Sequence, residues 1–141
     1  MRIFTDGGSR GNPGHAATGV VVLDGETILF ESGVYLGIAT NNVAEYEAVL
    51  RALSWVAKEK ELGHFPTPQT LEFRLDSQLV VEQLNGRYKI KQPHILAYVK
   101  KIQDVLTSLG YPVTFTHIPR SENARADALV NQALDSFLHS F

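Results

Sequence analysis

The stretch that most constrains the fold lies at the start of the chain, where a predicted strand meets a glycine-rich segment. Residues 2–5 (Arg-Ile-Phe-Thr) include β-branched and aromatic residues typical of a strand. Asp6 follows, and the next eight residues contain four glycines and a proline, which we expect to end the strand. A carboxylate would then lie at a strand end, beside main chain that a ligand can approach closely. The stretch alone fits a hairpin loop, with Asp6 capping a turn, equally well.

The amino-acid composition limits which kinds of protein this chain can be. The chain has 141 residues, 44% of them hydrophobic, which suits one domain with a substantial core. It has no apolar run near the roughly 18 residues of a membrane span and no N-terminal signal pattern. The absence of cysteine excludes disulfides and thiolate metal sites, and we expect a cytoplasmic protein. The net charge of −2 means that a nucleic acid would need a local basic patch, for which 13 basic residues suffice.

Three short strands are predicted before the first helix. They cover residues 2–5, 17–23 and about 27–36. Asp24 and Gly25 form a strong signal for a two-residue hairpin between the last two. Strands joined by such short connections form an antiparallel meander.

The hydrophobic period then changes from that of a strand to that of a helix. We expect a helix starting at the capping side chains of residues 40–42 and ending near Leu62. Further elements are expected as a strand at 70–75, a helix at 77–84, a helix from Pro93 to Gly110, a strand at 113–117 and a helix at 123–137. This order predicts a single α/β domain over residues 1–141, with residues 138–141 frayed. Its five-stranded mixed sheet has three antiparallel and two parallel strands, with helices on both faces.

Four acidic residues are placed where they can meet. Asp6 and Asp76 each follow a predicted strand, and if these strands are adjacent and parallel, both carboxylates emerge at one sheet edge. Glu45 is expected in the first turn of the following helix, and Asp127 adjoins the apolar stripe of the last helix. Four such acids repel one another unless cations are present. Hard oxygen ligands suit Mg²⁺ or Mn²⁺, and two ions about 3.5–4 Å apart can promote phosphodiester cleavage.

Each acid also has an ordinary structural interpretation. Glu45 can simply interact with the helix dipole, and Asp76 can cap the helix that follows it. Asp127 can form a salt bridge to Arg125 or Lys101. Spacing alone does not show that the four acids converge.

Four segments, taken in order, resemble ribonuclease H type 1. They are TDGGSRGNPG at residues 5–14, TNNVAE at 40–45, LDSQLV at 75–80 and SENARAD at 121–127. Each is weak alone, but together they are specific and extend over nearly the whole chain. The resemblance implies the ribonuclease H-like fold and an endonuclease that cuts the RNA strand of RNA–DNA hybrids.

The resemblance also assigns roles to residues of this chain. It implies that Asp6, Glu45, Asp76 and Asp127 hold two Mg²⁺ ions, for which Mn²⁺ can substitute. It implies a monomer whose partner is the hybrid duplex, recognised in part through the RNA 2′-OH. Substrate contacts are implied for Gly7, Gly8, Asn12, Thr40, Asn41, Asn42 and Gln78.

The sequence departs from many members of the family in two places. The region after the fourth strand's helix is short, leaving a basic connector at residues 87–91 in place of a long protrusion. That connector can touch phosphates or be a plain solvated link. We also expect no separate hybrid-binding domain, because Met1 adjoins the first strand, so this is the compact form of the family.

The second departure is the loop after the fifth strand. His117 falls where many members carry an auxiliary histidine, but Pro119 stiffens this glycine-free loop. A compact subgroup places an arginine here, and we favour Arg120 as the auxiliary catalytic group. His117 can instead be a core residue at the end of its strand.

Other functions remain open from the sequence. A metal-dependent nuclease of the same fold can act on double-stranded RNA or DNA junctions. A non-catalytic hybrid-binding module is disfavoured, because binding alone prefers fewer negative charges near phosphates. A nucleotide-binding protein would be expected to carry a G-x-x-x-x-G-K-[ST] loop, and none occurs.

Overall fold

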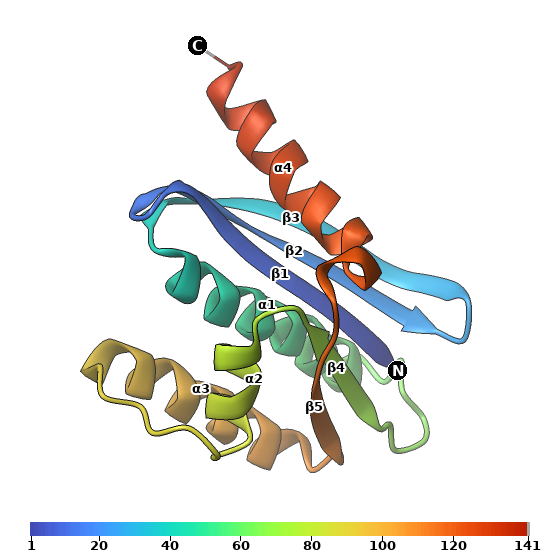
Figure 1. Ribbon diagram of the computed structural model, residues 1–141. Coiled ribbons are helices and arrows are strands. Elements are labelled where there is room, and N and C mark those ends of the chain that lie inside the picture. The colour runs from blue at the N-terminus through green and yellow to red at the C-terminus, as the bar shows by residue number, and fades with distance from the viewer. Residues whose placement is uncertain (141) are drawn as a thin grey trace.

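The computed structural model describes residues 1–140 (Figure 1). The elements in chain order are β1 (Arg2–Gly11), β2 (Gly14–Asp24), β3 (Thr27–Ala39), α1 (Asn41–Glu61), β4 (Leu71–Leu75), α2 (Gln78–Leu84), α3 (Pro93–Leu109), β5 (Val113–His117), a 3-10 turn η1 (Arg120–Glu122) and α4 (Ala124–Leu138). Leu138 is thus still helical, and the last residue of the predicted frayed tail, Phe141, lies outside the described residues.

One sheet organises the chain. Its strand order is β3-β2-β1-β4-β5. β1 pairs antiparallel with β2 and β2 with β3, whereas β1 pairs parallel with β4 and β4 with β5. This confirms the predicted mixed sheet, including the neighbouring parallel strands that lead to Asp6 and Asp76.

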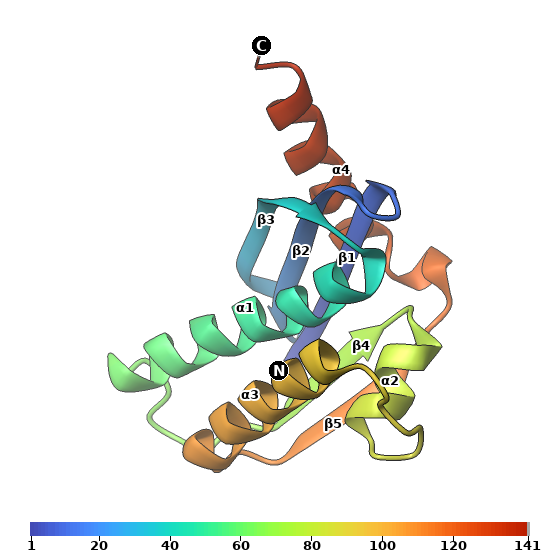
Figure 2. The same ribbon diagram turned by 90° about the vertical axis from the view of Figure 1, so that its left-hand side faces the viewer.

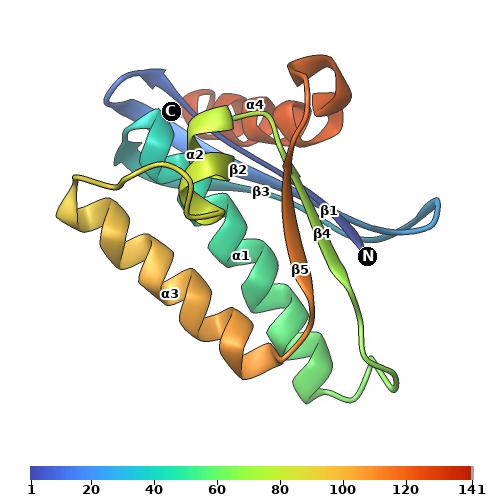
Figure 3. The same cartoon turned by 60° about the horizontal axis from the view of Figure 1, so that its bottom comes forward.

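Helices cover both faces of the sheet, as predicted. Figures 2 and 3 show α1 and α3 together on one face, with α2 beside them, and α4 alone on the other. The main core lies between α1, α3 and the sheet, and it contains the buried side chains Tyr46, Val49, Leu53 and Val56 of α1. A smaller cluster under α4 contains Ala17, Val130 and Leu134. No helix within residues 1–140 is long and apolar enough to span a bilayer.

The prediction that β1 ends at Asp6 is wrong. β1 continues to Gly11 and pairs with β2 throughout, from Arg2 opposite Leu23 to Gly11 opposite Gly14. The ladder to β2 keeps this segment extended although it is rich in glycine. Asp6 therefore lies within a strand, and the interpretation of Asp6 as a turn cap is also wrong.

Asp6 nevertheless lies at an edge of part of the sheet. The parallel pairing of β1 with β4 ends at Phe4 opposite Arg74, two residues before Asp6. Beyond that point β1 runs on without β4 beside it. Asp6 therefore faces the space at the carboxyl end of β4, where the chain turns into Asp76.

Candidate active site

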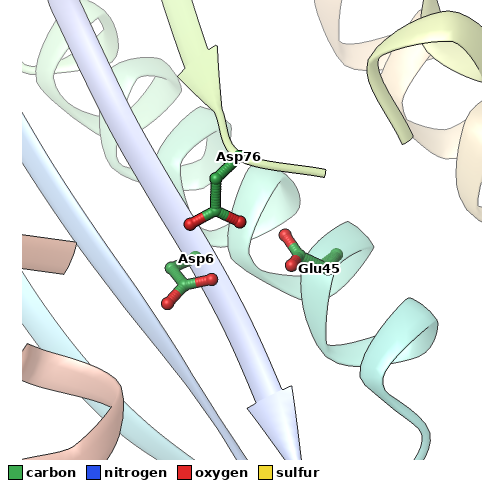
Figure 4. Close-up of side chains that lie close together, drawn as sticks. All are labelled: Asp6, Glu45 and Asp76. Atoms are coloured by element: carbon green, nitrogen blue, oxygen red, sulfur yellow. The ribbon is translucent and has the colours of Figure 1, made fainter. Parts of the chain in front are cut away.

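Three carboxylates from three different elements meet at the end of β4. Asp6 comes from β1, Glu45 from α1, and Asp76 from the residue that follows β4 (Figure 4). Each offers one oxygen, and these oxygens lie within 4.8 Å of one another. Asp6 and Glu45 are buried, so the group is largely removed from water.

Backbone geometry places Glu45 over Asp6. Thr40 caps α1, since its Oγ1 accepts a hydrogen bond from the Val43 N–H at 3.2 Å. The N–H of Gly7, in β1, donates to the Glu45 carboxylate. Glu45 lies beyond the first turn of α1, where the effect of the helix dipole falls off, so its predicted place in that turn is wrong.

Asp76 is held by the buried side chain of Asn123, which is distant from it in the sequence. Asn123 is only 1% exposed. Its Nδ2 donates to the Thr5 carbonyl at 2.9 Å and to Asp76 Oδ2 at 3.2 Å. The cap of α2 is Ser77, whose Oγ accepts from the Val80 N–H. The interpretation of Asp76 as a helix cap is therefore wrong.

Asp127 lies beside the three-acid group. It is half-buried in the first turn of α4, and it lies close enough to Asp6 to raise the pKa of that carboxyl. Arg125 pairs with Glu31 instead of Asp127, and the ammonium of Lys101 lies over the ring of Tyr98. Neither predicted salt-bridge partner is thus engaged with Asp127.

Crowding of the acids changes their protonation. Burial, then the charges of Asp76 and Asp127, raises the pKa of Asp6 to about 7. Burial, then the charges of Asp6 and Asp76, raises the pKa of Glu45 well above its usual range. Arg120 opposes both pKa shifts through its positive charge. Without a bound cation, part of this group therefore holds protons at neutral pH.

The residues present fit a divalent cation. Glu45 Oε2 is buried and has no hydrogen-bond partner among the described residues, a costly state that a metal ion would relieve. The converging oxygens are hard ligands of the kind that Mg²⁺ and Mn²⁺ prefer. The cluster of Asp6, Glu45 and Asp76 can therefore bind metal.

An open hollow of about 260 Å³ lies over these acids. Arg120 lines it together with Asp6, Glu45 and Asp127. His117, in contrast, is exposed at the end of β5. The interpretation of His117 as a core residue is wrong, and Arg120 has the better position to act on a group bound in the hollow.

Several predicted substrate-contact residues form a network at the rim. The Asn41 N–H donates to Asn12 Oδ1 at 3.0 Å, and the Ser9 N–H donates to Asn41 Oδ1 at 2.9 Å. The amide NH₂ groups of both asparagines can therefore still donate to a ligand. Gly7 and Gly8 line the hollow, while Gln78 is exposed at the start of α2. The substrate contacts of these residues, and of Asn42 and Thr40, stay predictions.

The basic connector is partly engaged within the protein. Arg87 forms an ion pair with Glu82 at 3.1 Å, and Tyr88 is exposed. Whether the connector touches phosphate stays a prediction.

Sequence reasoning missed residues that hold the acids. From the sequence, Asn123 is predicted only to begin the last helix, within the segment 121–127 that ends at Asp127. Asn131 has no such signal, because its contact with Arg10 joins two elements far apart in the sequence. The burial of Asn123 between Thr5 of β1 and Asp76 at the end of β4 becomes visible only once β1, β4 and α4 are assembled.

Comparisons with known proteins place this site in a family. A family model described as "Reverse transcriptase-like" matches residues 4–133. Ribonuclease HI of Halobacterium salinarum is 42% identical over 136 residues, covering 96% of this chain and 64% of that protein. Ribonuclease H of Paracidovorax citrulli is 33% identical over 153 residues, covering 96% of this chain and 95% of that protein.

A solved structure agrees with the fold and contains an RNA/DNA hybrid. LC11-RNase H1, crystallised in complex with an RNA/DNA hybrid, superposes with a TM-score of 0.89 at 45% identity, covering 97% of this chain and 98% of that one. The chain spans 64% of the length of the Halobacterium relative and 36% of related mycobacterial proteins. Fold, sequence similarity over nearly the whole chain and the acids at the end of β4 agree: the chain belongs to the ribonuclease H type 1 family.

Proposed function

We propose that this chain hydrolyses the RNA strand of RNA–DNA hybrids at the acidic group formed by Asp6, Glu45, Asp76 and Asp127. The observation that carries the proposal is the convergence of three of these oxygens within 4.8 Å at the end of β4. The fourth acid, Asp127, lies beside Asp6 and raises the pKa of that carboxyl. A binding module would gain nothing from this negative charge next to phosphates.

Mg²⁺ is the proposed cofactor, with Mn²⁺ as a substitute. Two such ions, when bound, neutralise charge on the phosphate and supply an activated water. Asp6, Glu45, Asp76 and Asp127 are the residues that would hold them. The raised pKa of Asp6, about 7, implies that metal binding displaces a proton and strengthens as pH rises.

The remaining residues are proposed to place the hybrid. Arg120, on the rim of the hollow, carries a permanent charge that can neutralise a phosphate oxygen. The amides of Asn12 and Asn41 are available as donors, and backbone of Gly7 and Gly8 lets the sugar–phosphate chain come close. A 2′-OH contact from such donors would distinguish RNA from DNA. The cytoplasmic location and the monomeric state expected from the sequence stay predictions.

Cleavage of matched duplexes tests the proposal. One sequence is prepared as an RNA–DNA hybrid, a double-stranded RNA and a DNA duplex, and each is incubated with the chain and Mg²⁺. We expect cleavage of the RNA strand in the hybrid alone. Equal cleavage of double-stranded RNA would favour the broader nuclease, and binding of the hybrid without cleavage would favour the binding module.

A further inference from the structure

A polar stripe on α4 links the active-site hollow to the outer end of β1. Asp127, Asn131 and Asp135 are four residues apart, so they lie along one face of the helix. Asn131 Nδ2 donates to the Asp127 carbonyl at 3.2 Å and lies 3.4 Å from Asp127 Oδ2. The Asn131 side chain is therefore a direct neighbour of the Asp127 carboxylate.

Arg10 of β1 forms a hydrogen bond with the Asn131 side chain of α4. Its Nη2 donates to Asn131 Oδ1 at 3.3 Å and forms an ion pair with Asp135 Oδ1 at 2.8 Å. Arg10 and Asn131 both line the hollow that contains Asp6, Glu45 and Asp127. A guanidinium on the amide oxygen polarises the amide, which makes its NH₂ group a stronger donor toward Asp127.

An ordinary stabilising role accounts poorly for this arrangement. The side chains of Arg10 and Asp135 are 40% and 53% exposed, and exposed ion pairs contribute little to stability. The pair of Arg125 with Glu31 already joins α4 to the sheet in the same manner, through a half-exposed arginine. Arg10 differs from Arg125 because it contacts Asn131, whose Nδ2 in turn donates a hydrogen bond to Asp127.

We propose that Asn131, held by Arg10, is a positioning residue that fixes the Asp127 carboxylate for metal binding, with Asp135 anchoring Arg10. Asp127 needs such help more than its partners do. Glu45 is held by the Gly7 N–H and Asp76 by Asn123. The charge of Asp127 opposes that of Asp6, and within residues 1–140 its carboxylate accepts a side-chain hydrogen bond from Asn131 alone. The inference rests on the proposed function for its consequence in cleavage, but not for its consequence in metal binding.

The test compares Asn131→Ala and Arg10→Ala with Arg125→Ala as the matched control. Mn²⁺ binding to substrate-free protein is measured by calorimetry, and hybrid cleavage is measured across a Mg²⁺ titration. Removing a residue that orients a metal ligand typically weakens metal binding by about 10- to 100-fold. Because the hydrogen bond from Asn131 to Asp127 is long, at 3.4 Å, we expect an effect near the lower end of this range. We expect about tenfold weaker Mn²⁺ binding and a matching rise in the Mg²⁺ needed for half-maximal rate in Asn131→Ala. Arg10→Ala should show a smaller change in the same direction.

Two controls separate positioning from general damage. Thermal unfolding in EDTA should be similar for Asn131→Ala and Arg125→Ala, and the KM for hybrid at saturating Mg²⁺ should stay at the wild-type value. In an Asp127→Asn background, adding Asn131→Ala should change Mn²⁺ affinity no further, because its target is gone.

The proposal is overturned if Asn131→Ala binds Mn²⁺ and responds to Mg²⁺ as Arg125→Ala does. It is equally overturned if the loss persists in full in the Asp127→Asn background. A wild-type chain that binds Mn²⁺ but leaves hybrids intact would contradict the proposed function alone, and calorimetry would still decide on Asn131.

Discussion

The backbone of Gly7 packs directly against that of Ala44, so closely that a Cβ on Gly7 would lie 2.1 Å from the Ala44 carbonyl carbon and 2.4 Å from the Glu45 nitrogen. No side chain fits between these two segments. This contact sets the start of α1 over β1, and it thereby brings Glu45 to Asp6. The glycine of the Asp-Gly pair thus has a structural role in assembling the acids.

Substitution of Gly7 by alanine should therefore destabilise the protein. The added methyl group meets backbone on α1, which cannot move aside cheaply, so we expect a loss of about 1–3 kcal/mol or more in the free energy of unfolding. Gly8→Ala is the matched control, because a Cβ there meets only Val130 Cγ1, at an ordinary contact distance of 3.6 Å, and alanine there should leave the free energy of unfolding unchanged or raise it by about 0.4–1 kcal/mol. Urea unfolding measures both, and equal midpoints would refute the packing argument.

Asn123 should matter for both stability and cleavage. Asn123→Ala leaves the Thr5 carbonyl without its buried donor and frees Asp76 from its orienting hydrogen bond, which should cost about 1–3 kcal/mol. The control is Asn85→Ala, since Asn85 Nδ2 also donates to a backbone carbonyl, that of Phe115 at 3.1 Å, but in an exposed position. Chemical denaturation and hybrid cleavage are measured together. A variant as stable and active as Asn85→Ala would contradict the assigned role.

Arg120 and His117 should differ in their effect on rate. Arg120 lines the acid hollow and lowers the pKa of both buried acids, whereas His117 is exposed at the end of β5. Removing a preorganised charge next to a reacting phosphate typically costs about 100-fold in rate, so we expect Arg120→Ala to lose about 10- to 100-fold in kcat. His117→Ala should stay within a few-fold of wild type. The reverse order in a single-turnover assay would reassign the auxiliary role to His117.

The metal-free protein should become less stable as pH rises. The pKa of Asp6 is about 7 in the folded chain against an ordinary value of 3.8, so the folded state binds the extra proton between these values. Stability is therefore greatest below about pH 4 as far as Asp6 is concerned and falls until about pH 7, by up to about 4 kcal/mol. Melting temperatures in EDTA should show this slope for wild type and a smaller one for Asp6→Asn. If the melting temperatures of the two proteins depended on pH in the same way, ionisation of Asp6 would not lower the stability of the folded protein.

The sequence predicted the order of the elements and the strand pairing well, because these depend on local pattern. Gly110 ends α3, as the sequence predicts. The hairpin between β2 and β3 is also present, but its turn residues are Gly25 and Glu26, because Asp24 still pairs with Thr27. The extent of β1 could not be predicted in this way, since its glycine-rich half is held extended by the ladder to β2. Local propensity argued for a loop, and tertiary pairing overrode it.

In the active site, too, local sequence pattern predicts some features, and others depend on how distant elements pack. The four acids can be selected from the sequence because Asp6 and Asp76 follow predicted strands, Glu45 is near a predicted helix start and Asp127 adjoins an apolar stripe. Only the assembled sheet places Asp6, Glu45 and Asp76 within 4.8 Å. Asn123 and Asn131 carry no comparable signal. Asparagine is common at helix starts and on helix surfaces, and its partners here come from distant elements of the chain.

The central claim is that these acids act together on divalent cations, and Asp6→Asn tests it most directly. The substitution keeps the shape of the side chain while removing a repulsive charge, so the variant should fold and be at least as stable as wild type in EDTA at pH 8. Single-turnover cleavage of an RNA–DNA hybrid in Mg²⁺ is the measurement. We predict a rate lower by orders of magnitude in a fully folded protein, and cleavage at the wild-type rate would contradict the account.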